Sequence, residues 1–135
     1  MIVYSMKNFK WKDLTLGESK CSLENYGCYI VSLSILLEIR PDTLLKTLNR
    51  SNCFTKEGKL LNDVAAKVLG CTYEYSKKQP EIVCIAETDH FAKKGFPQHF
   101  FVIENAQIID PLDGRIKQNP YNLVSFRIWE KRSKA

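Results

Sequence analysis

The fold is decided by the stretch YGCYIVSLSILLEI, which spans residues 26–39. From Ile30 onward this stretch is apolar on nearly every side of a helix, whereas a surface helix keeps a polar face. It therefore predicts a helix over 28–39 that lies buried at the centre of the fold. Pro41 is expected to end this helix, because proline disfavours helical geometry in the residue before it.

Two shorter helices are expected after the buried one. Asp42 or Thr43 can cap the second helix. The third is expected over 60–69, with Gly70 in the C-terminal capping position. Its inward-facing residues are expected to be Leu61, Val64, Ala65 and Val68. The first half of the chain is thus predicted to be helical.

The second half of the chain has the pattern of β-strands, in short runs rich in β-branched and aromatic residues. These runs cover 72–75, 81–86, 99–104, 107–110 and 123–129. The two-residue connection Asn105-Ala106 predicts that the third and fourth runs form an antiparallel hairpin, and residues 110–114 supply the next turn. Helices followed by an antiparallel sheet predict an α+β fold.

Composition limits the classes of protein that the chain can represent. A length of 135 residues without internal repeats or linkers predicts a single domain over 1–135. The net charge of +5 comes from basic residues interleaved with acidic ones, which favours a solvated surface over a nucleic-acid site. No stretch approaches the roughly 20 apolar residues of a membrane span. The N-terminus also lacks the pattern of a signal peptide, so a cytoplasmic location is expected.

The five cysteines are an odd number and form no CxxC pair. This disfavours a disulfide framework or a zinc site and favours reduced thiols. Neither a metal nor an organic cofactor is expected. At least one cysteine is therefore available for chemistry.

Cys28 is the candidate nucleophile, because it begins the most hydrophobic helix. Free backbone N–H groups and the positive end of the helix dipole favour a thiolate in a first turn. Gly27 is expected to leave room beside the sulfur for a substrate, and the backbone N–H of Cys28 can donate to an oxyanion. Judged by residue type alone, a buried structural cysteine is the alternative.

His99 and Asp110 are the candidate partners of this thiol. His99 begins one strand of the predicted hairpin and Asp110 ends the other, so strand pairing brings both to the same open end. A carboxylate orients an imidazole, which can then pair with a thiolate and later protonate a leaving amine. Taken singly, His99 can be a strand-end histidine and Asp110 a turn residue. Together with Cys28 they predict a Cys-His-Asp triad, whereas His90 is expected at the surface.

These motifs resemble those of the C39-like peptidases, a family of the papain-like cysteine peptidase superfamily that is often found in bacterial and phage proteins. The similarity runs from about Trp11 to Asp113. It is carried by the segments Trp11-Lys12, Leu16-Gly17-Glu18-Ser19, Tyr26-Gly27-Cys28, 32–37, Pro41-Asp42, Gly58-Lys59-Leu60, 99–103 and Ile109-Asp110-Pro111. The resemblance implies a papain-like fold, in which helices, including a buried central helix that starts at the nucleophile, pack on a C-terminal antiparallel sheet.

The resemblance also implies the roles of the site residues and a class of substrate. Cys28 would be the nucleophile, His99 the base and Asp110 its orienting acid. The reaction would hydrolyse a peptide or related amide bond through a thioester. The substrate could be a cell-wall peptide crosslink, a phage or host polypeptide, or an isopeptide bond, and the resemblance does not choose among them. A phage-encoded member could act in the virion or the host cell.

One position departs from the family pattern. The family usually carries a glutamine five residues before the tryptophan, and its side chain completes the oxyanion hole. Here Met6 occupies that position, and it cannot donate a hydrogen bond. Losing one such donor costs on the order of 10² to 10³ in rate. Either Asn8 or Asn25 replaces the glutamine, or the chain is a weakened papain-like domain that binds a peptide or a protein.

Overall fold

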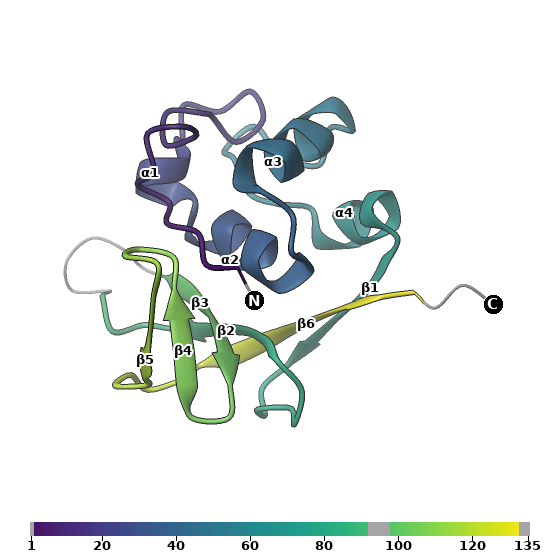
Figure 1. The fold of residues 1–135 in the computed structure, drawn as a ribbon. Helices are drawn as coiled ribbons and strands as arrows, with labels where there is room; N and C mark the ends of the chain where they lie inside the picture. The colour runs from purple at the N-terminus through teal and green to yellow at the C-terminus, as the bar shows by residue number, and fades with distance from the viewer. Residues whose placement is uncertain (1, 92–97, 133–135) are drawn as a thin grey trace.

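A computed structural model of the chain describes residues 2–91 and 98–132. In this part of the chain the helices come first and the strands follow (Figure 1). The helices are α1 (Leu23–Tyr26), α2 (Cys28–Leu37), α3 (Pro41–Arg50) and α4 (Asn62–Leu69). The strands are β1 (Cys71–Ser76), β2 (Cys84–Thr88), β3 (His99–Glu104), β4 (Gln107–Asp110), β5 (Arg115–Gln118) and β6 (Ser125–Lys131). The predicted α+β class is confirmed.

The strands form one antiparallel sheet in the order β1-β6-β2-β3-β4-β5. The last strand along the chain, β6, therefore lies inside the sheet, between β1 and β2. The helices lie over one face of the sheet, and α2 packs directly against β3 and β2 (Figure 1). This contact brings the start of α2 close to the sheet.

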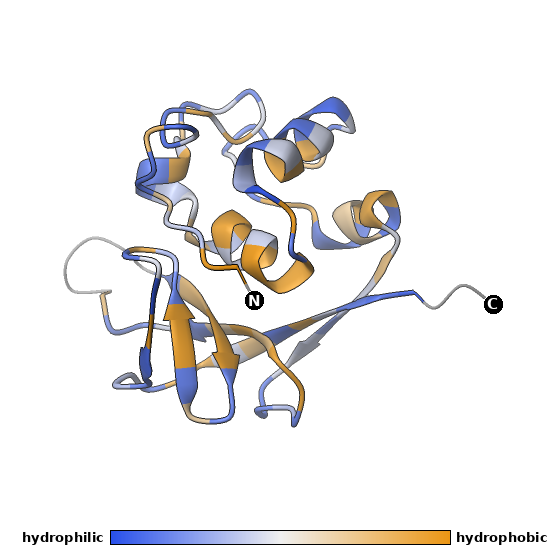
Figure 2. Cartoon of the chain, in the orientation of Figure 1, coloured by the Kyte–Doolittle hydropathy of each residue, from blue (hydrophilic) through white to orange (hydrophobic). Residues whose placement is uncertain are grey.

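Apolar side chains fill both faces of the sheet. A larger cluster lies between the helices and the sheet and includes Val31 and Leu33 of α2, which are fully buried. A smaller cluster on the other face centres on Phe101 and Phe126. Figure 2 shows α2 and the central strands as the most apolar elements of the chain. Their burial provides the main driving force for folding.

The buried helix is confirmed, but its predicted end is wrong. α2 ends at Leu37, because Glu38 adopts a left-handed conformation with φ of 58° and its N–H donates to the carbonyls of Ile35 and Ser34. Pro41 instead begins α3, since a proline at the first helical position needs no N–H partner. The turn between α2 and α3 is thus short.

The inward face predicted for the third helix is confirmed only for Ala65 and is wrong for the other three residues. Ala65 and Ala66 are the buried residues of α4, whereas Leu61, Val64 and Val68 are about 40% exposed. α4 packs on β1, and its alanine side allows the close approach. Gly70 ends the helix with φ of 67°, as predicted.

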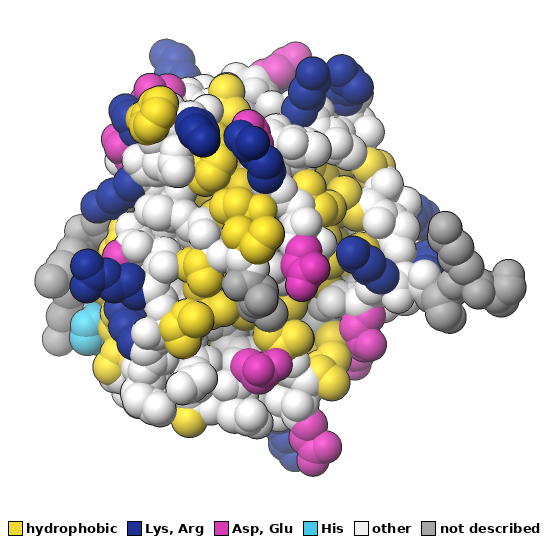
Figure 3. Space-filling view, in the orientation of Figure 1, with side chains coloured by type: hydrophobic (Ala, Val, Ile, Leu, Met, Phe, Trp, Pro, Cys, Tyr) yellow, Lys and Arg dark blue, Asp and Glu magenta, His cyan; other side chains and the backbone are white. Residues whose placement is uncertain are grey.

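The surface of the molecule mixes charges of both signs. On the face seen in Figure 3, Lys and Arg side chains are scattered among acidic ones. In the part of the chain that the structure describes, no helix is long and apolar enough to cross a membrane.

Candidate functional site

The backbone between α1 and α2 positions Cys28. α1 ends at Tyr26, Gly27 follows, and Cys28 is the first residue of α2. A Cβ atom on Gly27 would collide with the carbonyl oxygen of Leu23 and lie 2.7 Å from its Cα. The glycine is therefore required where α1 packs against the start of α2, which is a different reason from the expected room for a substrate.

Tyr29 anchors the first turn of α2 to three other elements. Its hydroxyl donates to Asn62 Oδ1 at 2.6 Å and accepts from Trp129 Nε1 at 3.1 Å. Its ring packs on Phe100 of β3 with 4.9 Å between the centroids. Burial raises the pKa of Tyr29, so the hydroxyl stays protonated. These contacts fix the turn that contains Cys28 against α4, β6 and β3.

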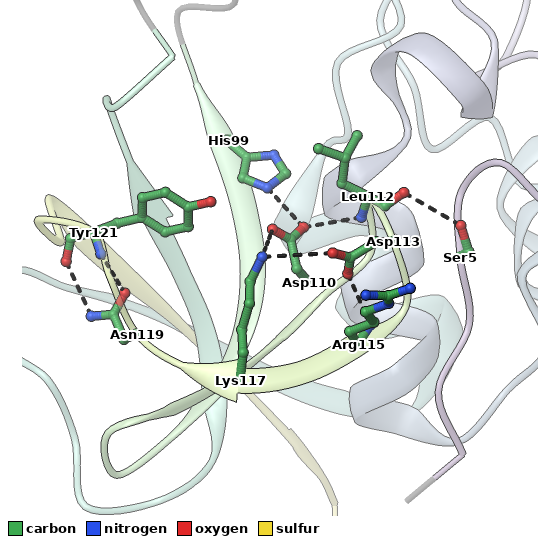
Figure 4. A network of polar contacts seen from close by, with 9 residues as sticks. All are labelled: Ser5, His99, Asp110, Leu112, Asp113, Arg115, Lys117, Asn119 and Tyr121. Carbon is green, nitrogen blue, oxygen red and sulfur yellow. Dashed lines mark hydrogen bonds and ion pairs between the residues drawn. The ribbon is translucent and has the colours of Figure 1, made fainter.

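The β3–β4 hairpin brings His99 and Asp110 together (Figure 4). His99 Nε2 and Asp110 Oδ1 are 2.9 Å apart, and both residues are buried. The connection uses Asn105 in the left-handed conformation, with φ of 57°, as a two-residue hairpin turn requires. Strand register therefore fixes the histidine beside the carboxylate.

The thiol of Cys28 acts on His99 as well, because it is among the groups that raise the pKa of the imidazole. Because Nε2 is bonded to Asp110, Nδ1 is the ring nitrogen that is left for another partner. Burial disfavours the charged imidazolium, but hydrogen bonds and charges from Asp110 and Cys28 outweigh it and raise the pKa of His99 to about 9. At neutral pH the imidazolium is therefore the favoured form.

Asp110 has further partners that keep it ionised. Burial opposes its charge, but the hydrogen bond and charge of His99, with a smaller effect of Lys117, lower the pKa of Asp110. The N–H of Leu112 donates to Asp110 Oδ1 at 3.0 Å. Lys117 Nζ lies 3.6 Å from Asp110 Oδ2 and 3.7 Å from Asp113 Oδ2 (Figure 4). Oδ1 of the carboxylate is thus hydrogen-bonded, and Oδ2 is ion-paired with Lys117.

Sequence reasoning missed Lys117, because β5 was not predicted. This strand is four residues long and mostly exposed, and it has no apolar alternation. Its register places Lys117 opposite Ile108, two residues from Asp110. A basic residue in a short run after the 110–114 turn was the available signal.

Aromatic side chains surround the other edge of His99. Phe91 meets the imidazole edge-on at 5.2 Å, and Phe101 lies 5.9 Å away. His90 is exposed, as predicted, and its ring packs between those of Phe91 and Tyr121 at 4.9 Å from each. The imidazole of His99 is thus shielded from water on this side.

The glutamine position of the family pattern is filled by a buried methionine. Met6 is 3% exposed, and its backbone N–H donates to the carbonyl of Pro111, directly after Asp110. Asn8 Oδ1 accepts from the N–H of Lys10 within its own turn, and Asn25 is exposed on α1. Among the described residues, no hydrogen bond joins either asparagine to Cys28. Which group stabilises an oxyanion therefore stays a prediction, for which the N–H groups of the first turn of α2 are available.

All five cysteines are free thiols. Burial raises the pKa of the Cys53, Cys71 and Cys84 thiols, to about 11 for Cys84. Cys21 is partly exposed like Cys28, but its Sγ faces the carbonyl of Glu57 at 3.4 Å. Within residues 2–91 and 98–132, no three side chains of His, Cys, Asp or Glu gather where they could bind a metal ion.

The site thus combines a thiol from α2, an imidazole from β3 and a carboxylate from β4. This arrangement can stabilise a thiolate beside an imidazolium whose far nitrogen is fixed by a carboxylate. Comparisons with family models, with curated proteins and with solved structures found no match to this chain. The argument for a function therefore starts from the geometry of these three side chains.

Proposed function

We propose that this chain is a thiol hydrolase, a papain-like cysteine peptidase or related amide hydrolase. The Cys28 thiolate attacks the carbonyl carbon of an amide, and the His99 imidazolium protonates the leaving amine, which gives a thioester. Neutral His99 then takes a proton from water, and the resulting hydroxide attacks the acyl carbon of the thioester. The C–S bond breaks, and the acyl group is released as a carboxylic acid. Cys28 leaves as a thiolate beside the reprotonated His99.

One observation carries the proposal: the buried imidazole of His99 is bonded to the carboxylate of Asp110 at 2.9 Å, and the thiol of Cys28, the first residue of α2, helps to raise its pKa. Two of these side chains come from strands that the hairpin joins, and the third comes from the start of a buried helix. A structural cysteine has no need of such partners. The resemblance to the C39-like peptidases supports the same assignment of roles.

Selective alkylation tests this proposal. The folded protein is treated with limiting iodoacetamide near pH 6, and the modified residues are mapped by mass spectrometry. An ordinary thiol is only about 0.3% ionised at this pH, so we expect Cys28 to react at least about tenfold faster than Cys21. His99→Ala is expected to remove that advantage. Equal labelling of the two cysteines would contradict the proposal.

A second candidate function is peptide binding without cleavage, which the buried Met6 favours. The two functions are separated by incubating the protein with a peptide library and measuring both cleavage and retention. A hydrolase yields new termini that disappear in Cys28→Ala. A binding module yields no new termini and retains the same peptides with either residue at position 28.

A further inference from the structure

A pocket of about 200 Å³ lies beside the candidate site, where α1, α2, the segment 54–62, β3 and β6 meet. Its walls include Tyr26 and Tyr29, which flank Cys28 in the sequence, and Gln98, which precedes His99. It is smaller than the 300 Å³ or more of a typical small-molecule site. The volume therefore suits one side chain of a longer ligand.

Slightly more than half of the pocket wall is apolar. Phe100 of β3 forms one side, with its ring packed on Tyr29. Ile30 of α2, Phe54 and Leu60 also line the pocket. An aromatic or branched aliphatic side chain that enters this space loses its contact with water, which stabilises binding.

The charged residues of the lining are both basic. Lys59 and Arg127 face the pocket, and none of its lining residues is acidic. The Arg127 guanidinium lies 4.8 Å over the ring of Phe100, and its NH1 bonds to Glu87 Oε1 at 3.1 Å. Glu87 also accepts hydrogen bonds from Ser125 and Gln98 and is buried. Its carboxylate is therefore committed to the protein and is not offered to a ligand.

The wall that contains Lys59 is fixed by its own hydrogen bonds. The N–H of Thr55 donates to the carbonyl of Lys59 at 2.8 Å, and the N–H of Gly58 donates to the carbonyl of Thr55 at 3.0 Å. The N–H of Lys59 donates to Thr55 Oγ1 at 3.1 Å. A wall that is ordered before a ligand arrives costs little entropy on binding.

We propose that this pocket binds one large uncharged side chain, aromatic or branched aliphatic, next to the scissile bond, and that it disfavours lysine and arginine. Apolar walls provide the attraction, and Lys59 provides the repulsion that excludes cationic side chains, since the charge of Arg127 is balanced by Glu87. The inference rests on the proposed peptidase function and adds to it a class of substrate.

Cleavage-site profiling tests the specificity. The protein is incubated with proteome-derived peptides that contain internal lysine and arginine, and the residues around each new terminus are read by mass spectrometry. We expect Phe, Tyr, Leu or Ile to be favoured over Lys and Arg by about tenfold or more at one position. Cleavage without a preference at any position would overturn the inference.

Two variants tie the preference to the pocket. Phe54→Ala enlarges the pocket and is expected to reduce the preference severalfold, whereas Ile82→Ala, an exposed apolar residue outside it, leaves the preference unchanged. Lys59→Glu is expected to admit lysine and arginine, and Lys56→Glu, with the same change of net charge in the same segment, is not. A preference that survives both Phe54→Ala and Lys59→Glu would overturn the inference.

A binding measurement separates failure of the pocket from failure of the proposed hydrolysis. ¹⁵N-labelled Cys28→Ala protein is titrated with N-acetylphenylalanine amide and, separately, with N-acetyllysine amide, and backbone amide shifts are followed by NMR. We expect the phenylalanine compound to shift the signals of Gly58, Leu60 and Phe100 severalfold more than the lysine compound does. This result supports the pocket even if no peptide is cleaved. Equal or absent shifts overturn the pocket even if cleavage occurs.

Discussion

His99 links the three side chains of the candidate site, and its protonation contributes to stability. Its pKa is about 9 in the folded protein, against 6.5 as the ordinary value. Between these values the folded state binds more protons than the unfolded state, so stability falls as pH rises. We expect the contribution, on the order of 3 kcal/mol, to be complete below about pH 6.5 and lost by about pH 9.

Urea unfolding at pH 6, 7.5 and 9 measures this effect. The free energy of unfolding of the unmodified protein should fall through this range. His99→Gln removes the titrating group, so its free energy of unfolding should change much less. Parallel pH dependences in the two proteins would show that His99 is not paired as described.

Lys117 stabilises the ionised form of Asp110 from β5, at 3.6 Å. Lys117→Met removes this charge, so the pKa of Asp110 should rise towards its ordinary value and the imidazolium should lose its partner at a higher pH. Because Lys117 is partly exposed, we expect the acid limb of Cys28 alkylation to move up by only a few tenths of a pH unit. Lys117→Arg should restore the original profile, and an unchanged profile in Lys117→Met would argue against this role.

The His99–Asp110 neighbourhood could be predicted at the residue scale because it depends on local register. A two-residue turn fixes which residues of β3 and β4 are opposite each other. The contact with Lys117 depends on a third strand, for which the sequence offers no period-2 pattern. The packing of Gly27 against Leu23 likewise depends on a four-residue helix that no pattern predicts.

At the scale of the element, α2 contains two serines, Ser32 and Ser34, whose hydrogen bonding can be compared directly. Both are fully buried. Ser34 Oγ donates to the carbonyl of Ile30 at 2.9 Å, whereas Ser32 Oγ has no partner among the described residues. A buried hydroxyl without a partner costs about 1 to 3 kcal/mol. The same helix therefore contains one satisfied and one unsatisfied hydroxyl.

We expect Ser32→Ala to raise the free energy of unfolding by about 1 kcal/mol, because it removes the unsatisfied group. Ser34→Ala should lower the free energy of unfolding by about 0.5 to 1 kcal/mol, because it removes a hydrogen bond. Chemical denaturation of both variants measures the difference. A loss of stability in Ser32→Ala as large as that in Ser34→Ala would indicate that Ser32 has a partner after all.

Elements with a strong pattern could be predicted, and short elements could not. The continuous apolar run predicted α2, and runs rich in β-branched and aromatic residues on either side of Asn105-Ala106 predicted β3 and β4 with the bounds that the structure has. α1 and β5 are four residues each, too short for any periodicity to emerge. The end of α2 was missed because Glu38 is an unusual residue in a left-handed cap, where glycine is preferred.

At the scale of the whole molecule, the stability lost when a side chain of the sheet is truncated should depend on how far its strand lies from the edge of the sheet. Phe126 is buried on the inner strand β6, and Ile116 is 59% exposed on the edge strand β5. We expect Phe126→Ala to lower the free energy of unfolding by about 3 to 5 kcal/mol, and Ile116→Ala by less than about 0.5 kcal/mol. Similar losses in denaturant unfolding would mean that β5 is as integral to the sheet as β6.

The α+β class follows from the order of the patterns along the chain, but the order of strands in the sheet does not. β6 pairs with β1 and β2, whose paired residues precede it by about 40 to 60 residues. Pairings over such distances depend on packing of the whole molecule and leave no local signal. The papain-like architecture itself stays a proposal.

The inner position of β6 also sets an order of events during translation. A ribosome makes α2, β3 and β4 first, so a nascent chain already contains Cys28, His99 and Asp110 before β6 emerges. Until then β1 lacks its partner in the sheet, and the pocket lacks Arg127. Because domains fold as units once their parts are synthesised, the sheet and the pocket are complete only after β6 has been made. Under the proposed function, a newborn chain would then be unable to act on its surroundings, or on its own unfolded segments, before that strand has been made.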